Sequence, residues 1–292
     1  MRSWLFIDGD SATKLTKAPM VGADAVVVDI SKIAISDESP KIMEGIADWL
    51  TAYSDPLILN KAFARWLRIK PLDAPHWRED LLIAMKGAPD GVVLPKTSGP
   101  DQIRTLASEL YEVEQKLGLK HNSTKIIPQI GETARAALTM SDLTRDPQPR
   151  LTGFAWNADN VARALGATRT HDKDGNWTDS MRHVRATTLF LAKAMGVMAI
   201  ETSASNPRDV EAGIAEARAA KHDGFTGVSA VHPRQISAIN QAFSLSAQER
   251  AEAEAIIGLF ATNPGVKTVE HEGKRLDQKD LAQMKEVRAL GC

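Results

Sequence analysis

The chain has almost no cysteine, since Cys292 is the single thiol among 292 residues. One cysteine excludes a disulfide framework and a thiolate metal site within a single chain, and it fits a reducing compartment. Long apolar runs are also lacking. The opening run, Trp4–Ile7, is too short for a signal peptide, and no stretch approaches the ~20 apolar residues of a membrane span. We therefore expect a cytoplasmic protein that does not bind membranes.

An excess of charge of one sign is also missing. The 36 Lys and Arg residues nearly balance the 37 Asp and Glu residues, which leaves a formal net charge of −1. No strong field then favours a nucleic acid or a membrane surface. The basic residues are scattered and do not cluster with aromatic residues, so we expect no nucleic-acid partner.

Common catalytic motifs are absent as well. The sequence contains no HExxH motif, Cys/His cluster, nucleophile elbow or P-loop. No GxGxxG motif follows the first apolar run, which counts against a dinucleotide-binding Rossmann fold.

The chain does contain a series of short apolar runs, each followed by a segment compatible with a helix. The runs are continuous and not alternating, which is typical of strands buried on both faces of a parallel sheet. Eight of them predict an α/β fold, a closed TIM (β/α)8 barrel, which needs roughly 250 residues. The runs are Trp4–Ile7, Ala25–Ile30, Trp66–Ile69, Gly91–Leu94, Ile126–Ile130, Leu151–Trp156, Val197–Ile200 and Gly227–Val231. A further run, Leu57–Asn60, is either a ninth strand or a loop.

The eightfold pattern ends before the chain does. We expect a catalytic barrel over residues 1–242 and a C-terminal helical extension over residues 243–292. Within the extension, Ser246–Thr262 and Gln278–Leu290 are expected to be helices, with a short hairpin near Gly273 between them. The extension is a candidate lid or oligomer contact.

Polar residues follow several of the predicted strands, where a (β/α) barrel builds its active site. Arg68 closes the third strand and suits a bidentate clamp on a carboxylate, although it could equally cap a neighbouring element at the surface. Lys96 ends the fourth strand as an electrostatic clamp, a Schiff-base amine or, more simply, a rim lysine in an ion pair.

The fifth and sixth strands are followed by oxygen-bearing side chains. Glu132 is a candidate metal ligand or base, or else a carboxylate at a helix start. Asp159 and Asn160 offer a carboxylate and an amide oxygen, or else cap the next helix. His232 ends the eighth strand, where we expect a packed, hydrogen-bonded residue and not a catalyst.

Several segments stand in a recognisable order. They are Arg2–Asp10, Gly22–Asp29, Arg68-Ile69 with Pro71–Asp73, Val92–Lys96, Ile130 with Glu132–Arg135, and Gly224–Gly227 with His232–Ile236. In this order they resemble the citrate lyase β-subunit-like group of the HpcH/HpaI aldolase superfamily, over nearly the whole chain. The last pair of segments is the most specific.

The resemblance implies a carbon–carbon lyase on a TIM barrel that assembles as a homo-oligomer, a trimer or a hexamer. Such enzymes cleave or form 3-hydroxy-acyl-CoA thioesters such as citryl-, malyl- or citramalyl-CoA, with an acyl-CoA and a 2-oxo acid as products. Mg²⁺ held by two carboxylates polarises the developing carbonyl, and an arginine offsets the negative charge.

By this resemblance Arg68 and Glu132 are the catalytic residues and also bind substrate. Lys96 and Lys32 are further candidates for substrate binding. Glu132 is the first metal ligand, and Asn160 stands at the position of the second.

The chain departs from the family pattern at charged positions. Asn160 replaces a carboxylate, Ser31-Lys32 replaces a Glu-Asp pair, Lys70 replaces an asparagine, and Glu201 replaces an aspartate. We therefore expect acidic groups to be lost and basic groups, Lys70 among them, to be gained around the mouth of the barrel. An amide keeps an oxygen donor but removes a charge, and two charges in a partly buried site interact by several kcal/mol at an effective dielectric of ~20. We therefore expect a weakened or metal-free Mg²⁺ site, with Lys32 pairing with Glu132 in place of the cation.

Two other functions stay open beside the lyase. One is a divergent barrel enzyme acting as a CoA thioesterase or as an aldolase on free oxo acids. The other is a non-catalytic binding protein. The presence of Arg68, Lys96 and Glu132 favours an enzyme.

Overall fold

The structure is a computed structural model that describes residues 1–55, 63–203, 206 and 209–290. The extra run Leu57–Asn60 lies outside these residues. The chain divides into two compact units, Met1–Ala242 and Phe243–Cys292. No helix in the described ranges is long and apolar enough to cross a membrane.

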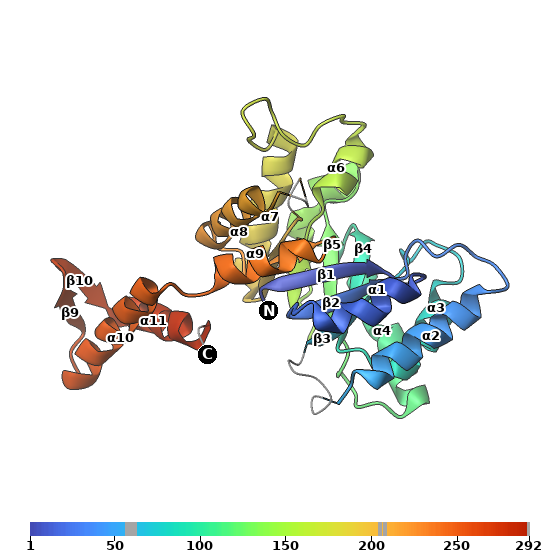
Figure 1. Cartoon of the computed structure of the whole chain (residues 1–292), viewed down its shortest axis with the longest axis horizontal. Helices are drawn as coiled ribbons and strands as arrows, with labels where there is room; N and C mark the ends of the chain where they lie inside the picture. The colour runs from blue at the N-terminus through green and yellow to red at the C-terminus, as the bar shows by residue number, and fades with distance from the viewer. Residues whose placement is uncertain (56–62, 204–205, 207–208, 291–292) are drawn as a thin grey trace. The chain divides into compact units, whose positions relative to one another are not determined.

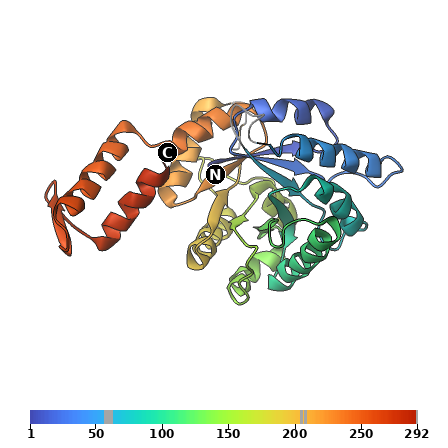
Figure 2. The ribbon, with the colours of Figure 1, turned by 90° about the horizontal axis from the view of Figure 1, so that it is seen from below.

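Eight parallel strands close into a barrel in the first unit, each hydrogen-bonded to its neighbours in chain order, with β8 returning to β1. This confirms the predicted TIM-barrel fold. Figures 1 and 2 show the strands at the centre with helices around them. The strands are β1 (Ser3–Asp8), β2 (Ala25–Asp29), β3 (Ala64–Arg68), β4 (Gly91–Thr97), β5 (Lys125–Ile130), β6 (Gly153–Ala155), β7 (Met198–Glu201) and β8 (Gly227–Ala230).

The helices of this unit alternate with the strands, as a parallel barrel requires. They are α1 (Ala12–Lys17), α2 (Ser39–Ala52), α3 (Trp77–Ala84), α4 (Pro100–Leu117), α5 (Ala134–Leu138), α6 (Ala158–Leu165), α7 (Asp179–Met195), α8 (Val210–Asp223) and α9 (Arg234–Phe243). Short 3-10 helices cover Ala18–Met20, Met85–Gly87 and Met140–Thr144.

The barrel interior is filled by apolar side chains from every strand except β8. This buried cluster consists of Trp4, Ala25, Val27, Trp66, Val93, Ile127, Ala155 and Ile200. The rings of Trp4 and Trp66 meet edge to face, with centroids 5.1 Å apart. Gly91 is required opposite them, because a Cβ there would lie 2.3 Å from the Trp66 ring.

Local sequence signals position the loops that follow the strands. Thr133 caps α5 by accepting a hydrogen bond from the Ala136 amide, and Asn157 caps α6 by accepting one from the Asn160 amide. Asn157 and not Asp159 or Asn160 is therefore the capping residue of α6. Asp159 and Asn160 lie in the first turn of that helix.

The second unit contains α10 (Ala247–Thr262), a two-stranded antiparallel sheet of β9 (Thr268–His271) and β10 (Lys274–Asp277), and α11 (Gln278–Leu290). A capping box begins α10, in which Ser246 and Glu249 satisfy each other's backbone amides. Glu272 and Gly273 both have positive φ, which suits a two-residue hairpin turn.

Candidate active site

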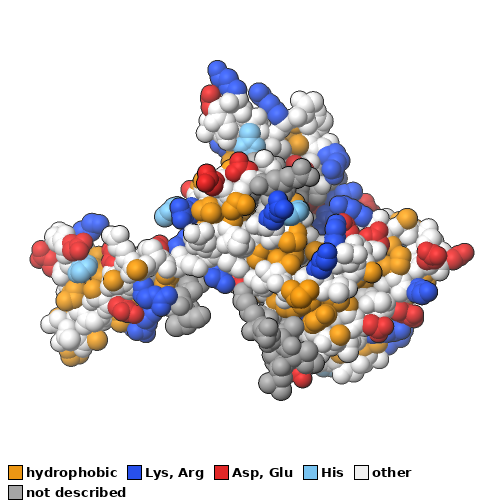
Figure 3. Space-filling view, in the orientation of Figure 1, with side chains coloured by type: hydrophobic (Ala, Val, Ile, Leu, Met, Phe, Trp, Pro, Cys, Tyr) orange, Lys and Arg blue, Asp and Glu red, His pale blue; other side chains and the backbone are white. Residues whose placement is uncertain are grey.

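A cavity of about 740 Å³ opens where the strands end, the edge at which barrel enzymes place their active sites. Figure 3 shows Lys and Arg side chains gathered on the surface between α1 and α6. The basic residues that line the cavity are Lys14, Lys32, Arg68, Lys96 and Arg163. The acidic ones are Asp8, Asp29, Asp73 and Asp159.

Arg68, at the end of β3, is held from three sides. Its Nε donates to Gln129 Oε1 at 2.6 Å, and its Nη1 donates to Asp29 Oδ2 at 3.1 Å and to Ser31 Oγ at 2.6 Å. Its side chain is 11% exposed. The Nη2 group has no hydrogen-bond partner in the part of the chain that the structure describes. Because Arg68 lines the cavity, two charged N–H donors remain for a ligand.

Asp29 and Gln129 had no assigned role in the sequence analysis. Asp29 ends β2, and Gln129 lies one residue before the end of β5. Both are buried, and both line the cavity. The signal that identifies them is the strand-end rule itself, applied to every strand and not only to residues with a family counterpart.

Glu132 is not among the residues that line the cavity, but it contacts Lys96 and Asn160, which are. The residue is 3% exposed. Its Oε2 accepts from the backbone N–H of Lys96 at 2.7 Å, and its Oε1 accepts from the Nδ2 group of Asn160 at 2.5 Å. The structure therefore brings three of the predicted residues together. Glu132 joins the ends of β4 and β5 to the first turn of α6.

Lys96 adopts an unusual backbone conformation at this point. Its φ is +53°, and the pairing of β4 with β5 shifts register between Leu94 and Thr97. A left-handed residue other than glycine is uncommon and costs free energy. The hydrogen bond from its N–H to Glu132 helps to hold this conformation, in which the exposed Lys96 side chain lines the cavity.

Asn160 uses both ends of its amide. Its Nδ2 group donates to Glu132, and its Oδ1 accepts from Nη1 of Arg163 at 3.0 Å, one helical turn further along α6. Arg163 was missed by the sequence analysis, which took α6 only as a source of oxygen ligands. A basic residue three positions after Asn160 on a helix is the signal that predicts the contact.

Lys32 does not make the ion pair expected of it. No ion pair joins Lys32 to Glu132, although both lie in described segments, and Glu132 instead accepts from Lys96 and Asn160. Lys32 is an exposed cation at the cavity wall. The pKa of Asp8 is lowered by the hydrogen bond from Lys14 and further by the charges of Lys14 and Lys32.

Lys70 also differs from expectation. It does not add charge to the cavity, because it is buried against α3, where its Nζ lies 2.6 Å from Asp80 Oδ2. The negative charge of Asp80 offsets the positive charge of Lys70. His232 is half-buried and accepts a hydrogen bond from the Arg234 amide at the start of α9.

The donors around Glu132 do not fit a magnesium ion as they stand. Mg²⁺ needs oxygen ligands at about 2.0–2.1 Å in octahedral geometry. Here Asn160 presents its nitrogen to Glu132, and its oxygen faces a guanidinium. Within the described residues, no group of three or more His, Cys, Asp or Glu side chains is placed to hold a metal ion.

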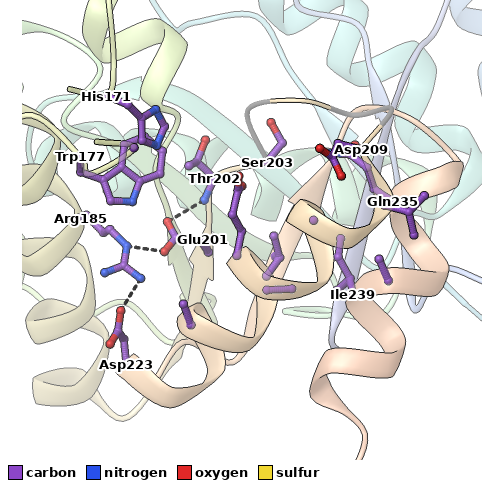
Figure 4. A pocket seen from close by; sticks show the side chains of 18 of the residues that line it. His171, Trp177, Arg185, Glu201, Thr202, Ser203, Asp209, Asp223, Gln235 and Ile239 are labelled. Atoms are coloured by element: carbon purple, nitrogen blue, oxygen red, sulfur yellow. Dashed lines mark hydrogen bonds and ion pairs between the residues drawn. The ribbon is translucent and has the colours of Figure 1, made fainter. Parts of the chain in front are cut away.

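Glu201, at the end of β7, belongs to a second cavity of about 540 Å³ (Figure 4). Burial raises the pKa of its carboxyl group, although the Arg185 guanidinium acts in the opposite direction. Trp156 Nε1 donates to its Oε1 at 2.6 Å, and Arg185 also reaches Asp223 at 2.8 Å. These contacts tie β7 to α7 and to the end of α8.

Comparison with known proteins places this chain in a family. The family described as HpcH/HpaI aldolase/citrate lyase matches residues 2–233. The chain is 26% identical to the citrate lyase subunit beta of Haemophilus influenzae over 288 residues, which cover 98% of this chain and 95% of that protein. It is 23% identical to the mitochondrial citramalyl-CoA lyase of Mus musculus over 300 residues, which cover 99% of this chain and 85% of that protein.

A solved structure agrees with these relatives. The citrate lyase beta subunit of Mycobacterium tuberculosis, complexed with oxaloacetate and magnesium, has a TM-score of 0.66 and 26% identity, covering 82% of this chain and 95% of that one. Together the fold and the relatives define the class as carbon–carbon lyase. The chain belongs to the HpcH/HpaI aldolase/citrate lyase family, as its sequence motifs predicted.

Proposed function

We propose that this protein cleaves or forms a 3-hydroxy-acyl-CoA thioester of the citryl-, malyl- or citramalyl-CoA type, with an acyl-CoA and a 2-oxo acid as the other partners. The observation that carries the proposal is the placement of Arg68. Its guanidinium is oriented by Asp29, Ser31 and Gln129 and keeps its Nη2 group for a ligand. A fixed guanidinium in a cavity suits the carboxylate or carbonyl oxygen of a 2-oxo acid.

Cleavage requires the loss of the proton from the 3-hydroxyl group of the substrate. The carbon that bears this hydroxyl group becomes the carbonyl carbon of the 2-oxo acid, and the electrons of the broken carbon–carbon bond pass to the α-carbon of the acyl-CoA. That carbon gains one proton, which balances the proton lost from the hydroxyl group. Arg68 stabilises the negative charge that develops on the oxygen of the former 3-hydroxyl group. The exposed ammonium groups of Lys32 and Lys96 attract the anionic substrate to the cavity.

Glu132 takes a positioning role in this proposal. It is buried and does not line the cavity, and its two oxygens hold the Lys96 backbone and the Asn160 side chain. Magnesium is present in the solved relative, but the arrangement around Glu132 does not fit it as folded. The steps proposed here therefore rest on the side chains of this chain alone.

The extension over residues 243–292 is proposed to serve as a lid or an oligomer contact, in a trimer or a hexamer. We propose a cytoplasmic location on the balanced charge and the lack of long apolar runs.

The direct test follows two products at once. Citryl-, malyl- and citramalyl-CoA are each incubated with the protein, while released 2-oxo acid and released thiol are measured separately. A lyase yields 2-oxo acid without free thiol. Free thiol without 2-oxo acid would instead identify a thioesterase, and neither product from any of these substrates would contradict the proposal.

Arg68→Ala provides the matching variant. We expect turnover to fall by about 100- to 1000-fold, the usual effect of removing one donor to a developing oxyanion. Arg68→Lys keeps the charge beside Asp29 but loses the fork of donors, so it should fold normally and still lose most activity. Arg78→Ala removes an exposed arginine that pairs with Glu109 on α4, and it should leave turnover unchanged. Full activity in both Arg68 variants would exclude a catalytic role for this residue.

A further inference from the structure

The Asn160 amide has only one chemically consistent orientation. The atom facing Glu132 Oε1 is 2.5 Å away, and the atom facing Nη1 of Arg163 is 3.0 Å away. Turning the amide over would bring two oxygen acceptors together at one end and two nitrogen donors together at the other. Glu132 and Arg163 therefore jointly fix the nitrogen toward the carboxylate.

The carboxylate of Glu132 is also fully engaged. One oxygen accepts from the Asn160 amide and the other from the backbone N–H of Lys96. With the residue 3% exposed, a cation would reach it only by displacing the Asn160 side chain. Displacement would leave the Arg163 guanidinium beside the incoming cation, and like charges repel.

The neighbouring carboxylate does not compensate for this arrangement. Asp159 is exposed on α6 and lines the cavity, whereas Glu132 is buried and is not among the lining residues. The two carboxyl groups are therefore in different environments. A hard divalent cation prefers oxygen ligands, but here it would meet one buried carboxylate and one amide whose nitrogen faces that carboxylate.

We propose that Arg163, Asn160, Glu132 and the Lys96 backbone form a hydrogen-bonded lock that takes the place of a divalent cation. The lock holds the end of β4, and with it the Lys96 side chain, in the geometry that the cavity requires. The site therefore binds Mg²⁺ and Mn²⁺ only weakly. Arg163 supports this arrangement, because it keeps the amide oxygen turned away from Glu132.

The proposal predicts that the largest gain in metal affinity requires two changes together. Asn160→Asp alone adds a carboxylate that Arg163 can pair with, since that guanidinium already lies 3.0 Å from Oδ1. Asn160→Asp combined with Arg163→Gln leaves two carboxylates without the Arg163 guanidinium in contact with either of them. We expect Mn²⁺ to bind the double variant at least about tenfold more tightly than the wild type, with Asn160→Asp in between.

The measurement is a titration of each protein with Mn²⁺, followed by loss of the free-ion electron paramagnetic resonance signal and repeated with Mg²⁺ by calorimetry. Arg163→Gln alone is the first control and should stay close to the wild type. Arg182→Gln is the second, because it removes an exposed arginine that pairs with Asp179 on α7 and does not line the cavity. Thermal unfolding verifies that each variant is folded.

Two outcomes would overturn the lock. One is wild-type protein that binds Mg²⁺ with a dissociation constant tighter than about 100 μM, a result that needs no variant to fold. The other is a folded double variant with no gain in Mn²⁺ affinity. The inference rests on the proposed function for the meaning of the site, but the titration needs no substrate. A protein without lyase activity could still show the predicted order of affinities, and an active lyase could still fail to show it.

Discussion

At the scale of single residues, the site depends on how each charged group is held. Arg68 is fixed by one carboxylate, one hydroxyl and one amide oxygen, so its orientation does not depend on the substrate. A guanidinium that is already oriented loses little freedom on binding, which is the physical basis of a preorganised site. The side-chain oxygen of Gln129 accepts the hydrogen bond from Arg68 Nε and so helps to orient the guanidinium.

Gln129→Leu should therefore impair turnover through Arg68. The variant removes the acceptor at 2.6 Å from Nε, and we expect kcat to fall about tenfold with a smaller change in KM. Gln129→Glu retains an oxygen acceptor and should restore most of kcat. Steady-state kinetics on the active thioester gives both parameters. Equal loss of kcat in the two variants would indicate a packing defect and would contradict the positioning role.

At the scale of the elements, buried charges connect helices to strands. Glu114 of α4 is fully buried and pairs with Arg150, which precedes β6, through two hydrogen bonds of 2.7 and 2.8 Å. The backbone amides of Asn122 and Thr124 also donate to this carboxylate. The pair thus ties α4 to the chain entering β5 and to the chain entering β6.

This pair makes the stability of the protein depend on pH. Burial by itself raises the pKa of Glu114, but the Arg150 guanidinium and the backbone amides outweigh it and lower the pKa from 4.5 to about 2. Because the folded pKa is depressed, the stabilisation is present above about pH 4.5 and is lost as the pH falls toward 2. The shift corresponds to about 3 kcal/mol.

Urea unfolding between pH 7 and pH 3 measures this loss. In Glu114→Gln the stability should be lower at pH 7 and should fall less steeply with acid, because the titrating group is gone. A slope identical to that of the wild type would show that Glu114 does not contribute to the acid sensitivity.

The packing of β3 against β4 leads to a second prediction at this scale. Gly91→Ala places a methyl group 2.3 Å from the Trp66 ring, so we expect a loss of about 1–3 kcal/mol in the free energy of unfolding. Gly45→Ala is the matched control, since Gly45 lies exposed within α2 and its Cβ would meet no atom within 4 Å. That change should stabilise the protein by about 0.4–1 kcal/mol. Chemical denaturation of the two variants compares them directly, and equal effects would contradict the steric argument.

At the scale of the whole molecule, the chain divides into two compact units. Every member of the apolar cluster inside the barrel comes from residues 1–242. Removal of residues 243–292 should therefore leave the barrel folded, with circular dichroism and thermal unfolding showing a cooperative transition. If the extension is a lid or an oligomer contact, the shortened protein loses turnover or changes its mass in light scattering. A truncated protein with unchanged mass and turnover would exclude both roles.

Much of this protein is determined by its sequence alone. Eight continuous apolar runs predict the closed barrel, because strands buried on both faces do not alternate apolar and polar residues. The bounds of single strands are less certain from sequence: the run Leu151–Trp156 contains the shorter strand β6, Gly153–Ala155. The strand-end rule located Arg68, Lys96, Glu132 and Asn160 near one edge. Family motifs added the enzyme class.

Only the tertiary structure decided which side chains pair with each other. Sequence analysis placed Lys32 beside Glu132 and Lys70 at the cavity, but Asn160 reaches Glu132 and Asp80 neutralises Lys70. Hydrogen-bond direction has no trace in a single sequence: asparagine carries both a donor and an acceptor, and only the positions of Glu132 and Arg163 decide which faces the carboxylate. The composition of the site thus follows from the order of residues along the chain. Whether the site holds a cation or a hydrogen-bonded lock depends on the hydrogen-bond distances among Glu132, Asn160 and Arg163, which are set only when the barrel has folded.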